Sequence, residues 1–186
     1  MSMTIRPATR ADIPTLEHLI PASARELSRG YYSEQQIEAA IRYVFGVDSQ
    51  LIADGTYFVA VDGKRIAGCG GWSWRRTLYG GDQRPIGAGA VLDPAKDAAR
   101  IRAFFVASGY ARQGIGGRIL SACEGAAVQK GFTRLELMST LPGVPFYRRF
   151  GFHEIERVAD TLPDGTTIEF VRMARRTSPH PADGFC

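Results

Sequence analysis

Hydrophobic and polar positions follow two periods along this chain, and these periods divide it into helices and strands. Apolar side chains recur every three or four residues over 13–20 and 37–45, which predicts two amphipathic helices. Thr9 or Asp12 can cap the first helix, and Ser33 with Gln36 forms a capping box for the second. Pro21 is expected to stop the first helix. A further helical stretch follows it and breaks at Gly30.

Short runs of alternating, β-branched or aromatic residues predict the strands. Asp62-Gly63 separates two such runs and predicts a tight hairpin, whose second strand carries glycines that permit a bulge. Another strand leads into a glycine-rich turn, a long helix and a further strand, and the chain closes with a short helix and a hairpin. The expected strands are 4–8, 57–61, 65–74, 101–106, 134–138, 152–158 and 166–173, and the later helices are 116–130 and 144–150.

Two segments have no clear period. Residues 75–99 contain four glycines and join two predicted strands, so a flexible flap over an active site, a dimer contact or a loop without a specific role are all open. Residues 174–186 are polar and are expected to form a disordered tail. The remaining residues, 1–173, then form a single α/β domain.

Composition narrows the functional classes. The chain has 186 residues, of which 45% are hydrophobic, and this suits one sizeable core. A net charge of +4 comes from scattered basic residues, whereas nucleic-acid binding would need a clustered patch. Cys69, Cys123 and Cys186 lack metal-ligand spacing. Since no apolar run reaches about 18 residues and no signal-peptide pattern opens the chain, we expect a soluble cytoplasmic protein with no nucleic-acid or membrane partner and no metal.

The stretch from Tyr110 to Arg118, Y-A-R-Q-G-I-G-G-R, lies at a strand-to-helix turn. Glycines let main-chain N–H groups approach a ligand closely, and a helix N-terminus favours phosphate. A P-loop would need Gly-Lys-Ser/Thr, which Gly116-Gly117-Arg118 does not supply. A dinucleotide fold would need G-x-G-x-x-G in a βαβ unit, whereas the preceding strands here read as antiparallel.

The same stretch resembles the acetyl-CoA loop of the GNAT superfamily of N-acetyltransferases, Q/R-x-x-G-x-G/A. Gly114 and Gly116 match its two glycines, while Ala111 stands at the Gln/Arg position and Arg112 follows one place later. A second motif lies downstream at the family's spacing. There, a strand over 134–138 precedes a helix that ends in the pattern F-Y-x-x-x-G-F, from Phe146 to Phe152.

The resemblance covers about residues 55 to 173 and implies a mixed, mostly antiparallel sheet flanked by helices. It also implies acetyl-CoA as co-substrate, with the pantetheine arm paired along the splayed strand near Phe105 and Val106. Thr140 falls where the family often has an Asn that touches the cofactor, and Arg149 is a further contact to its nucleotide end. The cofactor residues implied by the resemblance are Phe105, Val106, Arg112, Gln113, Gly114, Ile115, Gly116, Gly117, Arg118, Thr140 and Arg149.

The family motif also assigns chemistry. Tyr147 matches its tyrosine and is implied to donate a proton to the departing sulfur, although a packing role beside Phe146 is the alternative. No general base is identified. The carboxylates and imidazole weighed for that role are Glu26, Glu38, Glu136 and His153. Cys69 lacks an activating neighbour in the sequence, which favours direct attack in a ternary complex over an acylated cysteine.

Four aromatic residues were considered for the acceptor site. Tyr31 and Tyr32 follow the first helices, and Trp72 and Trp74 share one face of a strand. They favour a small-molecule amine that is partly apolar or cationic. A peptide or protein N-terminus, or an acyl-CoA-binding sensor without turnover, are the alternatives. Homodimerisation is common in the family and stays open here.

Overall fold

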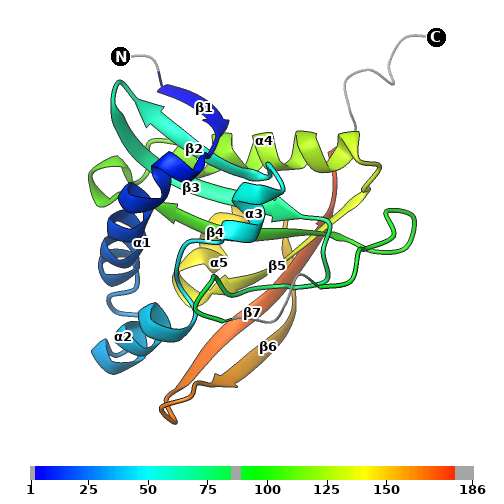
Figure 1. Cartoon of the computed structure of the whole chain (residues 1–186). Helices are drawn as coiled ribbons and strands as arrows, with labels where there is room; N and C mark the ends of the chain where they lie inside the picture. Colours follow the sequence, from blue (N-terminus) through cyan, green and yellow to red (C-terminus); the bar gives the residue numbers. More distant parts are fainter. Residues whose placement is uncertain (1–2, 85–88, 179–186) are drawn as a thin grey trace, which may run out of the picture.

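A seven-stranded sheet forms the centre of the computed structural model, which describes residues 3–84 and 89–178 (Figure 1). Its strand order is β1-β2-β3-β4-β5-β7-β6, and every neighbouring pair is antiparallel except β4 with β5. This confirms the predicted mixed, mostly antiparallel fold. The strands are β1 Met3–Pro7, β2 Tyr57–Asp62, β3 Arg65–Ser73, β4 Ala99–Val106, β5 Arg134–Thr140, β6 His153–Thr161 and β7 Thr167–Arg176.

Helices cover both faces of the sheet and create two separate cores (Figure 1). On one face, α1, α2 and α3 bury Leu16, Ile37 and Leu51 against the sheet. On the other face, α4 buries Ile119 and Cys123, and α5 joins it. The helices are α1 Ile13–Leu27, α2 Glu34–Tyr43, α3 Ser49–Ala53, α4 Ile115–Gln129 and α5 Val144–Arg149, with single turns η1 Arg10–Asp12, η2 Ser108–Tyr110 and η3 Leu141–Gly143.

The helical half follows the sequence in its caps but not in its boundaries. Ser33 and Gln36 form the expected capping box of α2, while Thr9 precedes the single turn η1 and Asp12 is the N-cap residue of α1. However, α1 continues through Pro21, contrary to the prediction. Proline leaves the carbonyl four residues earlier without its N–H partner. That carbonyl belongs to the exposed Glu17, where water can satisfy it. Helix α3 was not predicted, and Asp48 caps it by accepting a hydrogen bond from the Leu51 N–H.

β4 and β5 separate after a short paired stretch. Ala99–Ile101 pair with Leu135–Leu137, and within residues 3–84 and 89–178 no strand pairs with the rest of β4 on that side. A one-residue bulge on β4 lies opposite Gly70 of β3, where the register shifts. Ala103, the extra residue, has a φ of 55°, in the left-handed region that non-glycine residues rarely occupy. The Tyr57 hydroxyl donates a 3.1 Å hydrogen bond to the Ala103 carbonyl and fixes this conformation.

The segment between β3 and β4 is held against the domain, although its glycines predicted flexibility. The Gly81 N–H bonds the Val44 carbonyl at 3.1 Å, and the Asp82 N–H bonds the Val47 carbonyl at 2.9 Å. The Arg75 guanidinium pairs with Asp54. These bonds tie the described part of the segment to the linker between α2 and α3 and to the end of α3. Residues 85–88 lie outside the described residues.

The last strand runs further than predicted. β7 ends at Arg176, so residues 174–176 belong to the sheet and not to a tail. The extension is anchored because Arg175 forms a two-pronged ion pair with Glu124 of α4, with N–O distances of 2.7 and 2.9 Å. The Ser178 N–H also donates to Glu124. The rest of the predicted tail, 179–186, lies outside the described residues.

Candidate active site

The loop before α4 presents main-chain donors. Arg112 and Gly114 both have positive φ, 63° and 77°, and Gly114 is the N-cap of the helix. The first intrahelical bond of α4 runs from the Arg118 N–H to the Gly114 carbonyl, so the N–H groups of Ile115, Gly116 and Gly117 precede the hydrogen-bonded ladder. Among the described residues, no side chain caps this end, and the first turn of α4 holds no acidic residue. These donors suit a phosphate or pyrophosphate group.

The glycines of this loop serve two different purposes. Gly114 has open space around it, and its positive φ is the reason for glycine there. Gly116 and Gly117 instead lie under α5. A methyl group at Gly116 would be 3.0 Å from the Phe146 ring, and one at Gly117 would be 2.6 Å from Phe150. The sequence motif predicts that these glycines let a ligand approach closely. The structure shows that Gly116 and Gly117 also leave space for the rings of Phe146 and Phe150.

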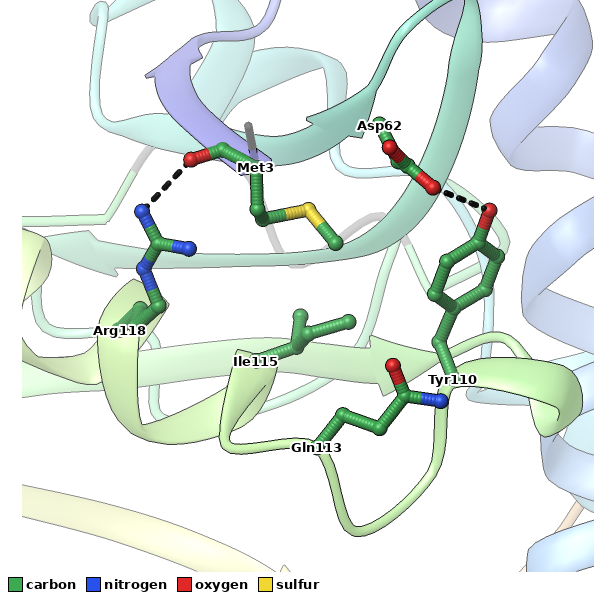
Figure 2. Close-up of a pocket in the computed structure, with 6 residues that line it drawn as sticks. All are labelled: Met3, Asp62, Tyr110, Gln113, Ile115 and Arg118. Atoms are coloured by element: carbon green, nitrogen blue, oxygen red, sulfur yellow. Dashed lines mark hydrogen bonds between the residues drawn. The ribbon is translucent and has the colours of Figure 1, made fainter. Parts of the chain in front are cut away.

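The remaining predicted residues of the loop point in different directions. Arg112 and Gln113 are exposed, and the Gln113 amide turns back to the Gly109 carbonyl. Figure 2 shows that Arg118 reaches toward β1, where it donates a 2.7 Å hydrogen bond to the Met3 carbonyl. A cavity of about 300 Å³ lies on this side of the loop, beside Asp62 and Tyr110. Arg118 is therefore engaged with β1, and we do not propose it as a phosphate contact.

The gap between β4 and β5 brings together the other predicted cofactor residues and Tyr147. Phe105 and Val106 on β4, and Thr140 at the end of β5, are all partly exposed. Gly143 lies between Thr140 and Tyr147, since a methyl group there would be 3.2 Å from the Thr140 hydroxyl and 3.4 Å from the Tyr147 ring. Thus the open edge of β4 and the phenol of α5 share one region, whereas the exposed Arg149 lies at the end of α5.

Tyr147 is buried among aromatic rings. Phe104 of β4, Phe146 of α5 and Phe152 surround it at centroid distances of 6.3, 5.0 and 5.6 Å. Burial raises its pKa well above the ordinary value near 10, and the nearby Cys123 adds to the effect. The side chain therefore stays a protonated hydrogen-bond donor at neutral pH.

Comparison with known proteins decides the family. A profile described as the acetyltransferase (GNAT) family matches residues 21–152, which includes the loop, the open edge of β4 and Tyr147. This chain belongs to the GNAT acetyltransferase family. It is therefore a GNAT N-acetyltransferase by family, and the predicted resemblance is confirmed. A search of curated protein sequences finds no match to this GNAT chain.

Solved structures share the fold at low sequence identity. A GCN5-related N-acetyltransferase from Rhodopseudomonas palustris is 19% identical, with a TM-score of 0.68 over 95% of this chain and 98% of that one. The PaiA N-acetyltransferase of Thermoplasma acidophilum, in complex with coenzyme A, is 18% identical, with a TM-score of 0.64 over 95% and 99%. YncA of Salmonella typhimurium, described with its cofactor acetyl-CoA, is 15% identical, with a TM-score of 0.62 over all of both chains.

The structure of this GNAT protein separates the four aromatic acceptor candidates. Trp72 and Trp74 do lie on one face, with rings 5.5 Å apart, but it is the face covered by α4. Trp72 is buried against Phe132, and the Lys130 amine lies 4.0 Å from the Trp74 ring. Both tryptophans therefore belong to the α4 core, and the expected acceptor role is not retained for them.

The two tyrosines lie on the opposite face, where α1 and α2 pack. Tyr32 is buried, and its hydroxyl donates to the Glu169 carbonyl at 2.6 Å and accepts from the Leu141 N–H at 2.8 Å. It therefore fastens the α1–α2 connection to η3 at the end of β5, and burial raises its pKa to about 12. Tyr31 is 51% exposed and has room for a ligand.

The four residues considered as possible general bases are either paired or exposed away from the gap. Glu136 lies between Arg100 at 2.9 Å and Arg172 at 3.5 Å, and Glu38 pairs with Arg25 at 2.6 Å. Glu26 and His153 are exposed on α1 and β6. Cys69 is fully buried, and burial raises its pKa to about 12, which disfavours the nucleophilic thiolate.

Sequence analysis did not identify two residues that hold β4 in place beside the gap. Tyr57 holds the bulge at Ala103 through its hydroxyl, and Arg102 forms a buried ion pair with Asp48 at 2.7 Å. Nothing in the spacing of residues 48, 57 and 103 indicates these contacts. The glycines at 68, 70 and 71 were the available signal, because they allowed a bulge in this part of the sheet.

Among residues 3–84 and 89–178, no helix is both long and apolar enough to cross a membrane.

Proposed function

We propose that this enzyme transfers the acetyl group of acetyl-CoA to the primary amine of a small molecule, by direct attack in a ternary complex. This proposal is supported by three features that occur together. They are the main-chain donors at the N-terminus of α4, the open edge of β4, and the Tyr147 phenol on α5. The coenzyme A and acetyl-CoA in the names of two similar structures agree with it.

The binding residues divide according to the parts of the co-substrate. The N–H groups of Ile115, Gly116 and Gly117 would hold the pyrophosphate, and the exposed Arg112 adds a cation at the rim. Beyond Ile101, the free side of β4 would pair with the amide groups of the pantetheine arm, as an added strand does. Acetyl-CoA supplies the activated thioester. The protein would orient this thioester and exclude water from it.

The reaction forms one N–C bond, breaks one C–S bond and moves one proton from the amine to the sulfur. A main-chain N–H group near Val106 would polarise the carbonyl as negative charge grows on its oxygen. Tyr147 would donate a hydrogen bond to the leaving sulfur. Because its pKa lies above that of a thiol, near 8.5, the phenol stabilises the thiolate without giving up its own proton permanently.

Direct attack is favoured over an acylated enzyme. Cys69 of β3 and Cys123 of α4 are both buried. Burial raises the pKa of each thiol. Neither thiol can reach a thioester as a thiolate. Within residues 3–84 and 89–178, Asp48 pairs with Arg102, and Glu136 pairs with Arg100 and Arg172, so neither carboxylate is free to take the amine proton. The acceptor would therefore enter as the neutral amine, and turnover should rise with pH.

The test is a free-thiol assay with acetyl-CoA and a panel of amines, amino acids and short peptides. We expect thiol release with small amines, and a fall in kcat of about 100-fold or more for Tyr147→Phe with KM for acetyl-CoA nearly unchanged. Tyr43→Phe on α2 serves as the matched control and should keep its activity. Release that survives Tyr147→Phe would remove the proposed role of Tyr147 at the leaving sulfur. A thermal shift with acetyl-CoA but no release would favour a sensor, and release with peptides alone would exclude the small-molecule acceptor.

A further inference from the structure

Packing against aromatic rings holds the Tyr147 phenol. The buried tyrosines Tyr32 and Tyr57 each donate a hydroxyl hydrogen bond to a main-chain carbonyl. The Tyr147 hydroxyl has no hydrogen-bond partner within residues 3–84 and 89–178, and three aromatic rings surround the side chain. The direction in which this hydroxyl points therefore depends on how those rings are fixed.

The end of α5 joins Tyr147 to Phe152, one of these rings. The Phe152 N–H donates to the Tyr147 carbonyl at 3.1 Å, and the Gly151 N–H donates to the Arg148 carbonyl at 3.0 Å. Because Gly151 has a φ of 83°, these are the two bonds of a Schellman motif. The motif brings the Phe152 and Tyr147 rings together, with centroids 5.6 Å apart. Since its ring and its main chain both contact Tyr147, a movement of Phe152 displaces the phenol.

Arg175 of β7 lies over the Phe152 ring, with its guanidinium carbon 4.9 Å from the ring centroid. Glu124 of α4 holds this guanidinium, because its carboxylate accepts two hydrogen bonds from it, at 2.7 and 2.9 Å. The Ser178 N–H donates to the same carboxylate at 2.7 Å. We call Arg175 and Glu124 the brace. It connects α4 and β7 to the residue that ends the Schellman motif.

The geometry of the brace restricts more than the position of one charge. A two-pronged pair between a guanidinium and a carboxylate fixes the plane of the guanidinium, which a lysine amine cannot do. The side chains of Arg175 and Glu124 are only 12% and 15% exposed, and Phe152 is buried. The attraction between a cation and a ring is stronger where water is excluded. The brace therefore holds the Phe152 ring in one place.

We propose that Arg175 is a positioning residue for the acetyl transfer and that it acts on Tyr147 through Phe152. The inference rests on the proposed function and adds to it a residue that lies outside the three features that support it. The brace holds Phe152, Phe152 holds the Tyr147 ring, and the phenol then meets the leaving sulfur in one direction. Misplacement of a reacting group by a distant substitution is costly because catalysis depends on orientation.

The experiment uses the double variant Glu124→Gln/Arg175→Met, which leaves no unpaired charge in place of the brace and should fold as the wild type does. Thiol release is measured with acetyl-CoA and the amine of the panel that gives the most release. We expect kcat to fall about 10- to 100-fold, with KM for acetyl-CoA nearly unchanged. Arg175→Lys keeps the positive charge without the two-pronged pair, and its kcat should lie between the two.

Arg6→Gln is the matched control. It breaks another two-pronged pair, with Asp12, next to the edge strand β1 at the far side of the sheet from β6 and β7. This variant should keep the wild-type kcat.

Two further measurements separate positioning from a general loss of structure. If Arg175 acts through the phenol, adding the two brace substitutions to Tyr147→Phe should lower kcat no further. The same fold-loss in both backgrounds would refute the proposal. Hydrogen exchange of the Phe152 amide needs no substrate, and it should be faster in the double variant than in the wild type, because the end of α5 is less firmly held. Unchanged exchange would also overturn the role of the brace.

The assay distinguishes failure of this inference from failure of the proposed function. An active wild type whose folded double variant keeps the wild-type kcat leaves acetyl transfer standing and refutes the positioning role. Wild-type release by Tyr147→Phe refutes the roles of Tyr147 and Arg175 together. No release from the wild type with any amine refutes the proposed transfer and this inference with it.

Discussion

Gly117→Ala tests whether the loop glycines exist for helix packing or for a ligand. The added methyl group would lie 2.6 Å from the Phe150 Cζ, a separation that real structures avoid. Phe150 must tilt, but Phe146 lies 5.0 Å away and limits that movement. Such overpacking costs about 1–3 kcal/mol, whereas alanine itself favours a helix over glycine by about 1 kcal/mol.

Gly125 provides the matched control on the same helix. No atom lies within 4 Å of a methyl group there. Gly125→Ala should therefore stabilise the protein by about 0.5–1 kcal/mol, and Gly117→Ala should be less stable than Gly125→Ala by about 1–3 kcal/mol. Because both changes include the same helical gain, the difference isolates the clash. Urea unfolding followed by circular dichroism measures it as a change in midpoint with constant m.

Two results would refute the packing argument. The first is equal stability of Gly117→Ala and Gly125→Ala, which would mean that the Phe150 ring moves without cost. The second is a stable Gly117→Ala that has lost acetyl-CoA binding, as seen by thermal shift, which would assign the glycine to ligand approach. Combining Gly117→Ala with Phe150→Leu should recover part of the lost stability, since the smaller side chain makes room for the methyl group.

The remaining predictions concern ion pairs. Asp12 accepts hydrogen bonds from Arg6 and from the Thr9 N–H, which lowers its pKa to about 2. A lowered pKa in the folded state gives stability that is present above pH 4 and disappears as the pH falls toward 2. In the Asp12→Asn variant, the free energy of unfolding should therefore depend less on pH in that window than it does in the wild type. Arg102→Met leaves Asp48 as a buried, unpaired carboxylate and should destabilise by about 3–5 kcal/mol in urea unfolding. Adding Asp48→Asn to Arg102→Met should restore part of the lost stability. If the double variant is no more stable than Arg102→Met, the two residues are not coupled.

Local signals in the sequence predicted what local chemistry determines. The Asp62-Gly63 hairpin and the Ser33 capping box formed as expected, because a turn or a cap depends on a few adjacent residues. Period two correctly placed Trp72 and Trp74 on one face. It could not tell which face, because that depends on where α4 packs. The extension of α1 past Pro21 has a similar cause, since burial on the face opposite the proline kept the helix intact.

The candidate site shows the same division. The proposed phosphate loop and Tyr147 lie within motifs of contiguous residues, so the sequence alone was enough to propose them. The docking of the β3–β4 segment on the α2–α3 linker depends on main-chain hydrogen bonds from Gly81 and Asp82 to Val44 and Val47, and no spacing rule connects these positions. The free energy of that docking is a sum of long-range contacts, and one sequence alone does not reveal such contacts.

The extra residue in β4 has a consequence for how such a sheet can arise. Ile101 faces the α4 core, Arg102 and Ala103 face the other side, and Phe104 faces α4 again. Removing Ala103 would leave every other side chain on the face it already has, because the strand would simply regain strict alternation. A one-residue insertion of this kind can therefore bend a strand while every other side chain keeps its place in one of the two cores.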